Sequence, residues 1–272
     1  MAFGGTAQAV EADIITRVRN AQRARRVQYT LRFALTWALI IGALALVIYA
    51  TDNAEVEWLA EWGPYVLGGV GVTILVCVSS IIIATILALF GAIGRLSLNP
   101  FVNGVASLYV SIVRGTPLIV QIYFIFFALP QVGIIIDAIP AGIAALSFNY
   151  GAYMTEIFRA GIQAVPRGQR EAAEALAMPE RIVMRRIVLP QAVRIVVPAI
   201  GNEFIAMIKD SALVSIIGVQ ELLWRANTTG RAQLEQIQAF LLAALIYWIL
   251  TIFFSFFQGK LERRFAESDR RI

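Results

Sequence analysis

Polar side chains recur at helical spacing inside an apolar stretch near the middle of the sequence. Asn149, Tyr153 and Glu156 are separated by four and three residues, which places them on one face of a helix. An amide and a phenol can form hydrogen bonds with both charged and neutral groups. We therefore expect this face to line a substrate path, in preference to a purely structural role in hydrogen bonds between helices.

A second apolar stretch carries two further polar faces. Asn202 lies seven residues before Lys209, and Glu203 lies seven residues before Asp210. Ionisable groups inside a membrane span are costly, so each indicates a pathway, a pair or a pore wall. Asn202 and Glu203 are candidates for the same substrate path. Lys209 and Asp210 form either a gate or a structural pair.

Other chemistries are excluded by what the sequence lacks. It has no histidine, and its single cysteine, Cys77, lies inside an apolar stretch, so we expect no metal site, no serine triad and no disulfide. It also contains no G-x-x-x-x-G-K-[ST] phosphate loop, because Phe254 stands where the first glycine would precede Gly259 and Lys260. We expect no catalytic residues, and no hydrolysis of ATP by this chain itself.

The elements that position these side chains must be membrane spans. Charged residues make up 15% of the chain and the mean hydropathy is +0.73, whereas soluble domains carry about 25% charge. A span needs about 20 mostly apolar residues. We expect an all-α membrane protein of about six transmembrane helices, within residues 33–50, 62–94, 115–130, 141–159, 194–219 and 239–259.

The distribution of basic residues predicts the topology. Twenty of the 23 lysines and arginines fall in the N-terminal arm, near residues 95 and 114, in the segment 159–194, or in the tail. The opposite loops hold only Arg225 and Arg231, and the first of them, 51–62, is acidic. The positive-inside rule places both termini and residues 160–193 in the cytoplasm. We expect attraction to anionic lipid, no nucleic acid binding and, with about 30 residues before the first span, no cleaved signal.

The long loop before the fifth span reads GQREAAEALAMPERIVMRRIVLPQAV. It predicts a short helix over 169–177 with a stripe of small apolar residues, ended by Met178-Pro179, and a second, arginine-rich helix over 180–188. Such a stripe can lie in a hydrophobic groove of a partner. An ordinary amphipathic connector is the alternative. The stripe consists of Ala172, Ala173, Leu176 and Ala177.

This loop resembles the EAA loop of ABC transporter permeases. Glu171, Ala172 and Ala173 match its start, Leu189 and Pro190 match its end, and Ala177 fills its glycine position. The segments VRGTPLIVQIYFIFFALP, NYGAYMTEIFRAGIQAVPRGQ and PAIGNEFIAMIKDSALVSIIGVQELL are similar to the polar amino acid branch of these permeases. The resemblance covers residues 62–265. It implies a five-helix type I ABC importer core, to which this chain adds an N-terminal span.

The resemblance also implies a function and a set of partners. The chain would be the permease of an ATP-driven importer of polar or charged amino acids, a multi-pass protein of the prokaryotic cytoplasmic (inner) membrane. Two cytoplasmic ATPase subunits would bind the ATP and Mg, and a second permease and an extracytoplasmic amino-acid-binding protein would complete the assembly. No cofactor is expected on this chain. The residues expected to couple it to the ATPase are Glu171, Ala172, Ala173, Ala177, Leu189 and Pro190.

We accordingly divide the chain into a basic arm with an extra span (1–55), a transporter domain (56–265) with the coupling loop at about 165–193, and a cytoplasmic tail (266–272). The alternative is a secondary transporter or channel driven by an ion gradient, with Glu156, Glu203 and Asp210 as ion sites. A structural membrane protein would leave the loop unexplained. Arg114 either marks the cytoplasmic end of the third span or contacts the coupling region.

Overall fold

The computed structural model describes residues 19, 22–23, 25, 27–39, 41–43 and 56–269, which form two units, Met1–Val56 and Glu57–Ile272. In the first unit, residues 27–39 and 41–43 are helical. The rings of Tyr29, Phe33 and Trp37 contact one another in sequence, at four-residue spacing. The second half of the expected first span, residues 44–50, lies outside the described residues, as do residues 51–55 of the acidic loop.

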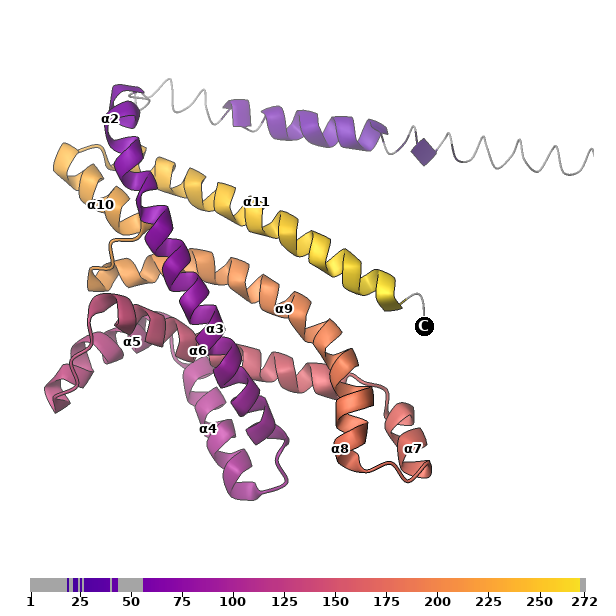
Figure 1. Cartoon of the computed structure of the whole chain (residues 1–272). Helices are drawn as coiled ribbons and strands as arrows, with labels where there is room; N and C mark the ends of the chain where they lie inside the picture. Colours follow the sequence, from indigo (N-terminus) through magenta and orange to yellow (C-terminus); the bar gives the residue numbers. More distant parts are fainter. Residues whose placement is uncertain are drawn as a thin grey trace, which may run out of the picture. The chain divides into compact units, whose positions relative to one another are not determined.

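The core of the second unit is a pair of long helices, α3 (Gly69–Leu96) and α6 (Ala138–Gln163) (Figure 1). Buried alanines recur along α3 at positions 84, 88 and 92, which leaves room for α6. A Cβ at Gly91 would overlap the hydroxyl of Thr155 in α6, so the two backbones approach closely there. Ser147, Asn149 and Thr155 of α6 are buried, so these polar residues face protein.

The all-α membrane class is confirmed. Three helices of the described residues are long and apolar enough to cross a membrane: Glu57–Leu96, Glu180–Ile217 and Gln236–Phe265. A fourth span results if the bent pair Pro100–Gly115 and Leu118–Val132 crosses once. The buried helix α6 has 26 residues, enough for the length of a span, but is too polar to be counted with these three.

The third span, expected over 115–130, is helical over 118–132, and a sharp bend precedes it. The helix α4 (Pro100–Gly115) ends where α5 (Leu118–Tyr123) begins, and the two directions differ by 107°. Thr116 is extended because it precedes Pro117, whose ring disfavours helical geometry in the residue before it. After α5 come the π-helix η1 (Phe124–Ala128) and the 3₁₀-helix η2 (Leu129–Val132). The chain therefore makes a sharp corner at residues 115–117.

A buried carboxylate joins the helices at the end of the unit opposite the coupling loop. Glu221 begins α10 (Leu222–Gln233), and its oxygens accept from Trp224 N at 2.8 Å and from the Tyr247 hydroxyl at 2.5 Å. Tyr247 belongs to α11 (Gln236–Asp269), while Thr73 of α3 accepts from Leu222 N. Burial raises the pKa of the Glu221 carboxyl, although these donors oppose the shift.

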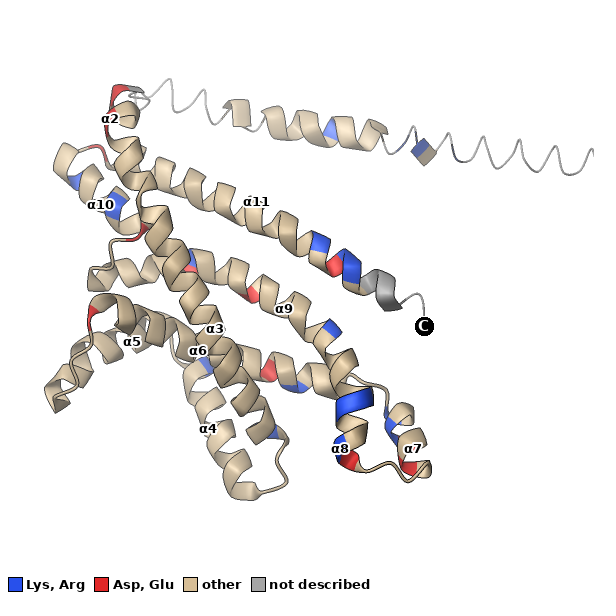
Figure 2. Ribbon diagram, viewed as in Figure 1, with Lys and Arg blue, Asp and Glu red and all other residues tan. Residues whose placement is uncertain are grey.

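The coupling loop contains two short helices, as the sequence predicts. They are α7 (Arg167–Ala175) and α8 (Glu180–Val183), and α8 continues through the π-helix η3 (Met184–Val188) into α9 (Leu189–Asp210). The 3₁₀-helix η4 (Ser211–Ile217) follows. Figure 2 shows lysines and arginines of this unit at α7, α8 and toward the C-terminal end of α11, at the same end of these helices. Since α9 starts at the loop, it links the loop to the interior.

Candidate functional site

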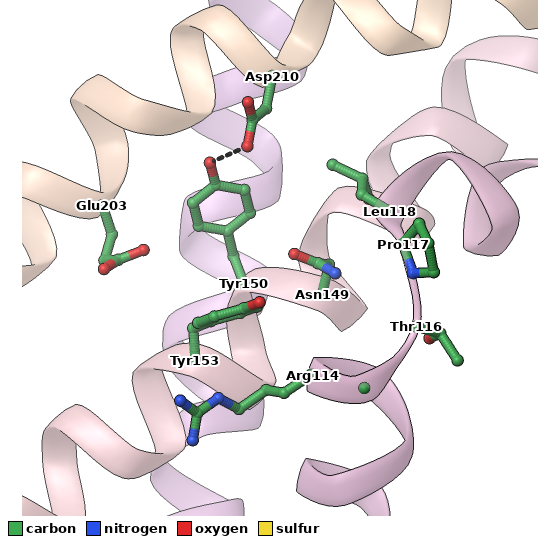
Figure 3. Close-up of a pocket in the computed structure, with 10 residues that line it drawn as sticks. Arg114, Thr116, Pro117, Leu118, Asn149, Tyr150, Tyr153, Glu203 and Asp210 are labelled. Carbon is green, nitrogen blue, oxygen red and sulfur yellow. Dashed lines mark hydrogen bonds between the residues drawn. The ribbon is translucent and has the colours of Figure 1, made fainter.

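A cavity of about 530 Å³ lies where α6, α9 and the corner at residues 115–117 meet (Figure 3). Its wall combines a guanidinium from Arg114, amide and phenol groups from α6, and the carboxylates of Glu203 and Asp210 from α9. Drug-sized ligands occupy cavities of about 300–1,000 Å³, so a free amino acid fits with room for water. Such a polar cavity inside an apolar protein is a candidate binding site.

The cavity wall shared by α6 and α9 is held by a hydrogen bond. The Tyr150 hydroxyl donates to Asp210 Oδ2 at 2.8 Å. Glu203 lies about two turns earlier on the same helix and is half-buried. The two carboxylates therefore line one side of the cavity.

The opposite wall is formed around Arg114, which ends α4. Its guanidinium lies over the ring of Tyr153, 5.1 Å from the centroid (Figure 3). Arg114 thus stands directly before the third span, and its side chain also lines the cavity. The corner at residues 115–117 is what brings Arg114 to the cavity.

Asn149 connects α6 to the corner. This buried side chain donates through Nδ2 to Gln121 Oε1 at 3.3 Å. Gln121 in turn donates to the carbonyl oxygens of Val113 at 2.8 Å and Thr116 at 3.2 Å, which the broken helix leaves without helical partners. Asn149 thus lines the cavity and also braces the corner that forms it.

The charges of the cavity are suited to a zwitterion. A guanidinium can bind a carboxylate through two parallel hydrogen bonds, while carboxylates attract an ammonium group. Arg114 lies on one wall, and Glu203 and Asp210 lie on the other. An α-amino acid placed between them meets a favourable charge at each end.

The structure brings together Asn149, Tyr153, Glu203 and Asp210, four of the sequence-based candidates. Glu156 is not in the cavity wall, although it shares the helical face of Asn149. Its two oxygens accept from Arg95 at 3.0 Å and from Arg159 at 2.7 Å, which fixes the end of α3 to α6. A carboxylate held by two guanidinium groups on this side of the helix is a structural junction.

Asn202 and Lys209 also lie away from the cavity wall. Asn202 points toward α11, where its Nδ2 lies 3.5 Å from Glu262 Oε1. Lys209 is exposed, and the structure shows no ion pair between it and Asp210, because adjacent helical residues point apart.

The residues of the apolar stripe expected on the first loop helix are partly buried and partly exposed. Ala173 is 2% exposed and packs in the loop's own small core with Val165, Val183 and Val188. Ala172 and Leu176 are exposed, and Leu176 is 76% exposed. A partner can therefore reach Glu171, Ala172 and Leu176, while Ala173 is covered by the chain itself. Leu189 and Pro190 are also exposed, at the start of α9.

The loop helix ends in a Schellman turn. Ala177 N donates to Glu174 O at 2.8 Å, and Met178 N donates to Ala173 O at 3.0 Å. The turn requires a left-handed residue at position 177, and Ala177 adopts φ +53°. Glycine takes this conformation without cost, whereas alanine does not. The turn thus keeps its shape with alanine in the glycine position.

Sequence reasoning missed Tyr150 and Gln121. Tyr150 is adjacent to Asn149, and the sequence NYGAY already contained the signal of two tyrosines beside an amide. Gln121 follows the RGTP corner by four residues, but a helix break inside an apolar stretch gave no reason to connect it to Asn149. Both residues contact groups more than 25 positions away in the chain.

Several known proteins are similar to this chain in sequence. The chain is 42% identical over 202 residues to the L-cystine transport system permease protein TcyB of Bacillus subtilis (strain 168), covering 74% of this chain and 86% of that protein. It is 39% identical over 208 residues to the arginine transport system permease protein ArtQ of the same organism, covering 76% and 94%. A putative glutamine transport system permease protein GlnP of Rickettsia conorii is 37% identical, covering 76% and 97%.

A solved structure is similar to this chain as well. The crystal structure of an amino acid ABC transporter with histidines superposes with a TM-score of 0.75 at 37% identity, over 78% of this chain and 99% of that chain. The family model of the binding-protein-dependent transport system inner membrane component matches residues 80–267, which include α6, the coupling loop and α9. The chain therefore belongs to this family of inner membrane permeases, and it is a permease component of an amino acid ABC transporter.

Proposed function

We propose that this permease imports polar or charged amino acids by alternating access, driven by ATP hydrolysis on separate subunits. The observation that carries the proposal is the cavity with Arg114 on one wall and Glu203 and Asp210 on the other. Cystine, arginine and glutamine, after which the relatives are named, each have an α-carboxylate and an α-ammonium group. The cavity charges are placed to recognise these shared groups.

Arg114 would bind the α-carboxylate of the substrate. Its guanidinium already lies flat against the Tyr153 ring, so little side-chain freedom is lost on binding. Glu203 and Asp210 would attract the α-ammonium group or a cationic side chain. Asn149 offers an amide that can bond charged and neutral side chains alike.

The energy would come from two ATPase subunits that bind ATP and Mg in the cytoplasm. The coupling loop presents Glu171, Ala172 and Leu176 outward on a helix whose other face is anchored by Ala173. A helix anchored in this way moves as a body with the partner that holds it. Because α8 and η3 continue into α9, the movement would reach Glu203 and Asp210.

The complete importer would also contain a second permease and an extracytoplasmic binding protein, with both termini of this chain in the cytoplasm. The second permease would supply the other half of the transport pathway. The binding protein would deliver the substrate to the cavity from outside.

The test is uptake by the reconstituted complex. The chain is purified with its neighbouring ATPase and binding protein, placed in proteoliposomes, and supplied with radiolabelled arginine, glutamine, glutamate and cystine. We expect uptake that requires ATP and the binding protein and persists with ionophores. Glu203→Gln should reduce it, whereas Glu235→Gln, a carboxylate outside the cavity wall, should not. Uptake driven by an ion gradient without ATP would overturn the proposal.

A further inference from the structure

The helices α9 and α11 run antiparallel (Figure 1), and a buried polar side chain of α11 contacts the backbone of α9. Gln258 of α11 is 7% exposed. Its Nε2 donates to the carbonyl oxygen of Pro198 at 2.5 Å and to Glu262 Oε1 at 3.2 Å. We call Pro198, Gly201, Gln258 and Glu262 the α9–α11 clasp. A buried amide is costly without partners, so this contact fixes the two helices in one register.

The clasp holds α9 at its weakest position. Pro198 lies inside the helix and has no N–H, so one helical hydrogen bond is missing and the helix can bend there. Three residues later, Gly201 has no side chain, and a Cβ at this position would overlap the Gln258 amide. Proline and glycine together therefore allow both flexibility of α9 and close approach of Gln258.

Pro198 also lies between the coupling loop and the cavity along the same helix. The loop ends where α9 begins, at Leu189, and the cavity carboxylates Glu203 and Asp210 come after Pro198. Immediately beyond the clasp, the rings of Phe204 and Phe254 meet edge to face at 5.1 Å. A movement that travels along α9 from the loop to the carboxylates passes Pro198. At that position the missing hydrogen bond lets the helix bend, so the movement is only partly passed on.

We propose that Gln258 is a positioning residue that braces the Pro198 position of α9 against α11, so that movement of the coupling loop reaches Glu203 and Asp210 as one displacement. This role rests on the proposed function. Without the Gln258 contact, α9 bends at Pro198 when the loop moves, and the cavity carboxylates are displaced less than the loop. ATP hydrolysis then continues, but fewer substrate molecules cross for each ATP consumed.

The experiment measures amino acid imported per ATP hydrolysed in the reconstituted complex. Gln258→Leu keeps the size of the side chain and removes its donor. Gly201→Ala leaves residue 258 a glutamine but places a Cβ where the Gln258 amide lies, so the amide must move. We expect both to lower the ratio about threefold to tenfold, with ATPase association retained. The matched control is Gln238→Leu, which changes another buried glutamine of α11 far from Pro198 and should leave the ratio unchanged.

A double variant separates this role from general packing. Pro198→Ala restores the missing helical hydrogen bond, so in that background Gln258→Leu should cost at most half of what it costs alone. Equal losses in both backgrounds would overturn the proposal, as would an unchanged ratio in Gln258→Leu. Hydrogen exchange of residues 199–205 should accelerate in Gln258→Leu, and unchanged exchange would also count against the clasp. If the wild-type complex imports nothing with ATP, the proposed function fails, and these exchange rates still decide whether the clasp exists.

Discussion

The cavity and the coupling loop are connected by one helix, α9, yet opposite interactions stabilise them. In the cavity, polar side chains lie among apolar helices and are held by hydrogen bonds to other helices, such as Tyr150 to Asp210 and Asn149 to Gln121. In the loop, a small apolar core around Ala173 supports a helix whose outer face is left exposed. The polar side chains of the cavity thus find partners on other helices of this chain, whereas the loop helix keeps its outer face exposed.

The largest expected effect comes from the exposed face of the loop. Leu176→Asp or Glu171→Lys should lower uptake at least about tenfold, because loss of an interface anchor costs about 2 kcal/mol or more. Both side chains are exposed, so the amount of protein in the membrane should not change. Co-purification of the ATPase and uptake are measured together.

The control is Leu98→Asp, which alters a fully exposed leucine between α3 and α4, outside the loop. It should retain the ATPase. Normal uptake in both loop variants would mean that this face is not the docking surface. The loop would then not differ from the cavity in depending on a partner.

A smaller effect is expected from the cavity hydrogen bond. Tyr150→Phe removes the donor to Asp210 and should lower uptake several-fold, with only a small loss of stability, since hydrogen bonds between membrane helices are worth about 0.6 kcal/mol on average. Tyr153→Phe keeps the aromatic ring beneath Arg114, so it should change uptake and stability very little. Uptake kinetics and thermal unfolding in detergent measure the two quantities. A larger loss of uptake in Tyr153→Phe than in Tyr150→Phe would show that the Tyr153 hydroxyl, and not the Tyr150–Asp210 hydrogen bond, is the more important of the two.

The core of the loop offers a test of stability rather than of docking. Ala173→Leu places three extra carbons among Val165, Val183 and Val188, and overpacking of this kind costs about 1–3 kcal/mol. The matched variant Ala172→Leu adds the same carbons at an exposed position and should leave the fold unchanged. Proteolysis of the loop in the purified complex distinguishes them. Equal protection of the two variants would show that Ala173 is not buried by its own chain.

The smallest effect concerns the turn at Ala177. Ala177→Gly relieves a left-handed alanine and should stabilise the loop by about 0.5 kcal/mol, after the greater unfolded-state entropy of glycine is subtracted. Hydrogen exchange of the Ala177 and Met178 amides should slow slightly. Faster exchange in the glycine variant would contradict the Schellman geometry.

The sequence predicted the elements better than their contacts. The all-α membrane class, the two loop helices and the shared face of Asn149 and Tyr153 follow from hydropathy and periodicity, which are local properties. Gly115 and Pro117 predict a disturbed helix start at the third span, but they do not predict the 107° bend that brings Arg114 to the cavity. Periodicity predicts on which face of a helix a residue lies, but it does not predict which other segment packs against that face.

Glu156 and Ala173 illustrate this limit. Glu156 lies on the same face as Asn149 but meets Arg95 from α3, a partner 61 positions away. Ala173 belongs to the predicted stripe, but the return of α8 and η3 covers it. In both cases a neighbour from another helix decides the surroundings of the residue, and helical periodicity carries no signal for that pairing.

The most direct test compares competition profiles of one cavity variant and one loop variant. Uptake of a labelled amino acid in proteoliposomes is measured against an excess of each unlabelled polar amino acid. Asn149→Ala, in the cavity wall, should change the order in which competitors inhibit while the ATPase stays bound. Glu171→Lys should lower uptake of every amino acid in equal proportion and keep the order. An unchanged order in Asn149→Ala, or a changed one in Glu171→Lys, would contradict the separation of recognition from coupling.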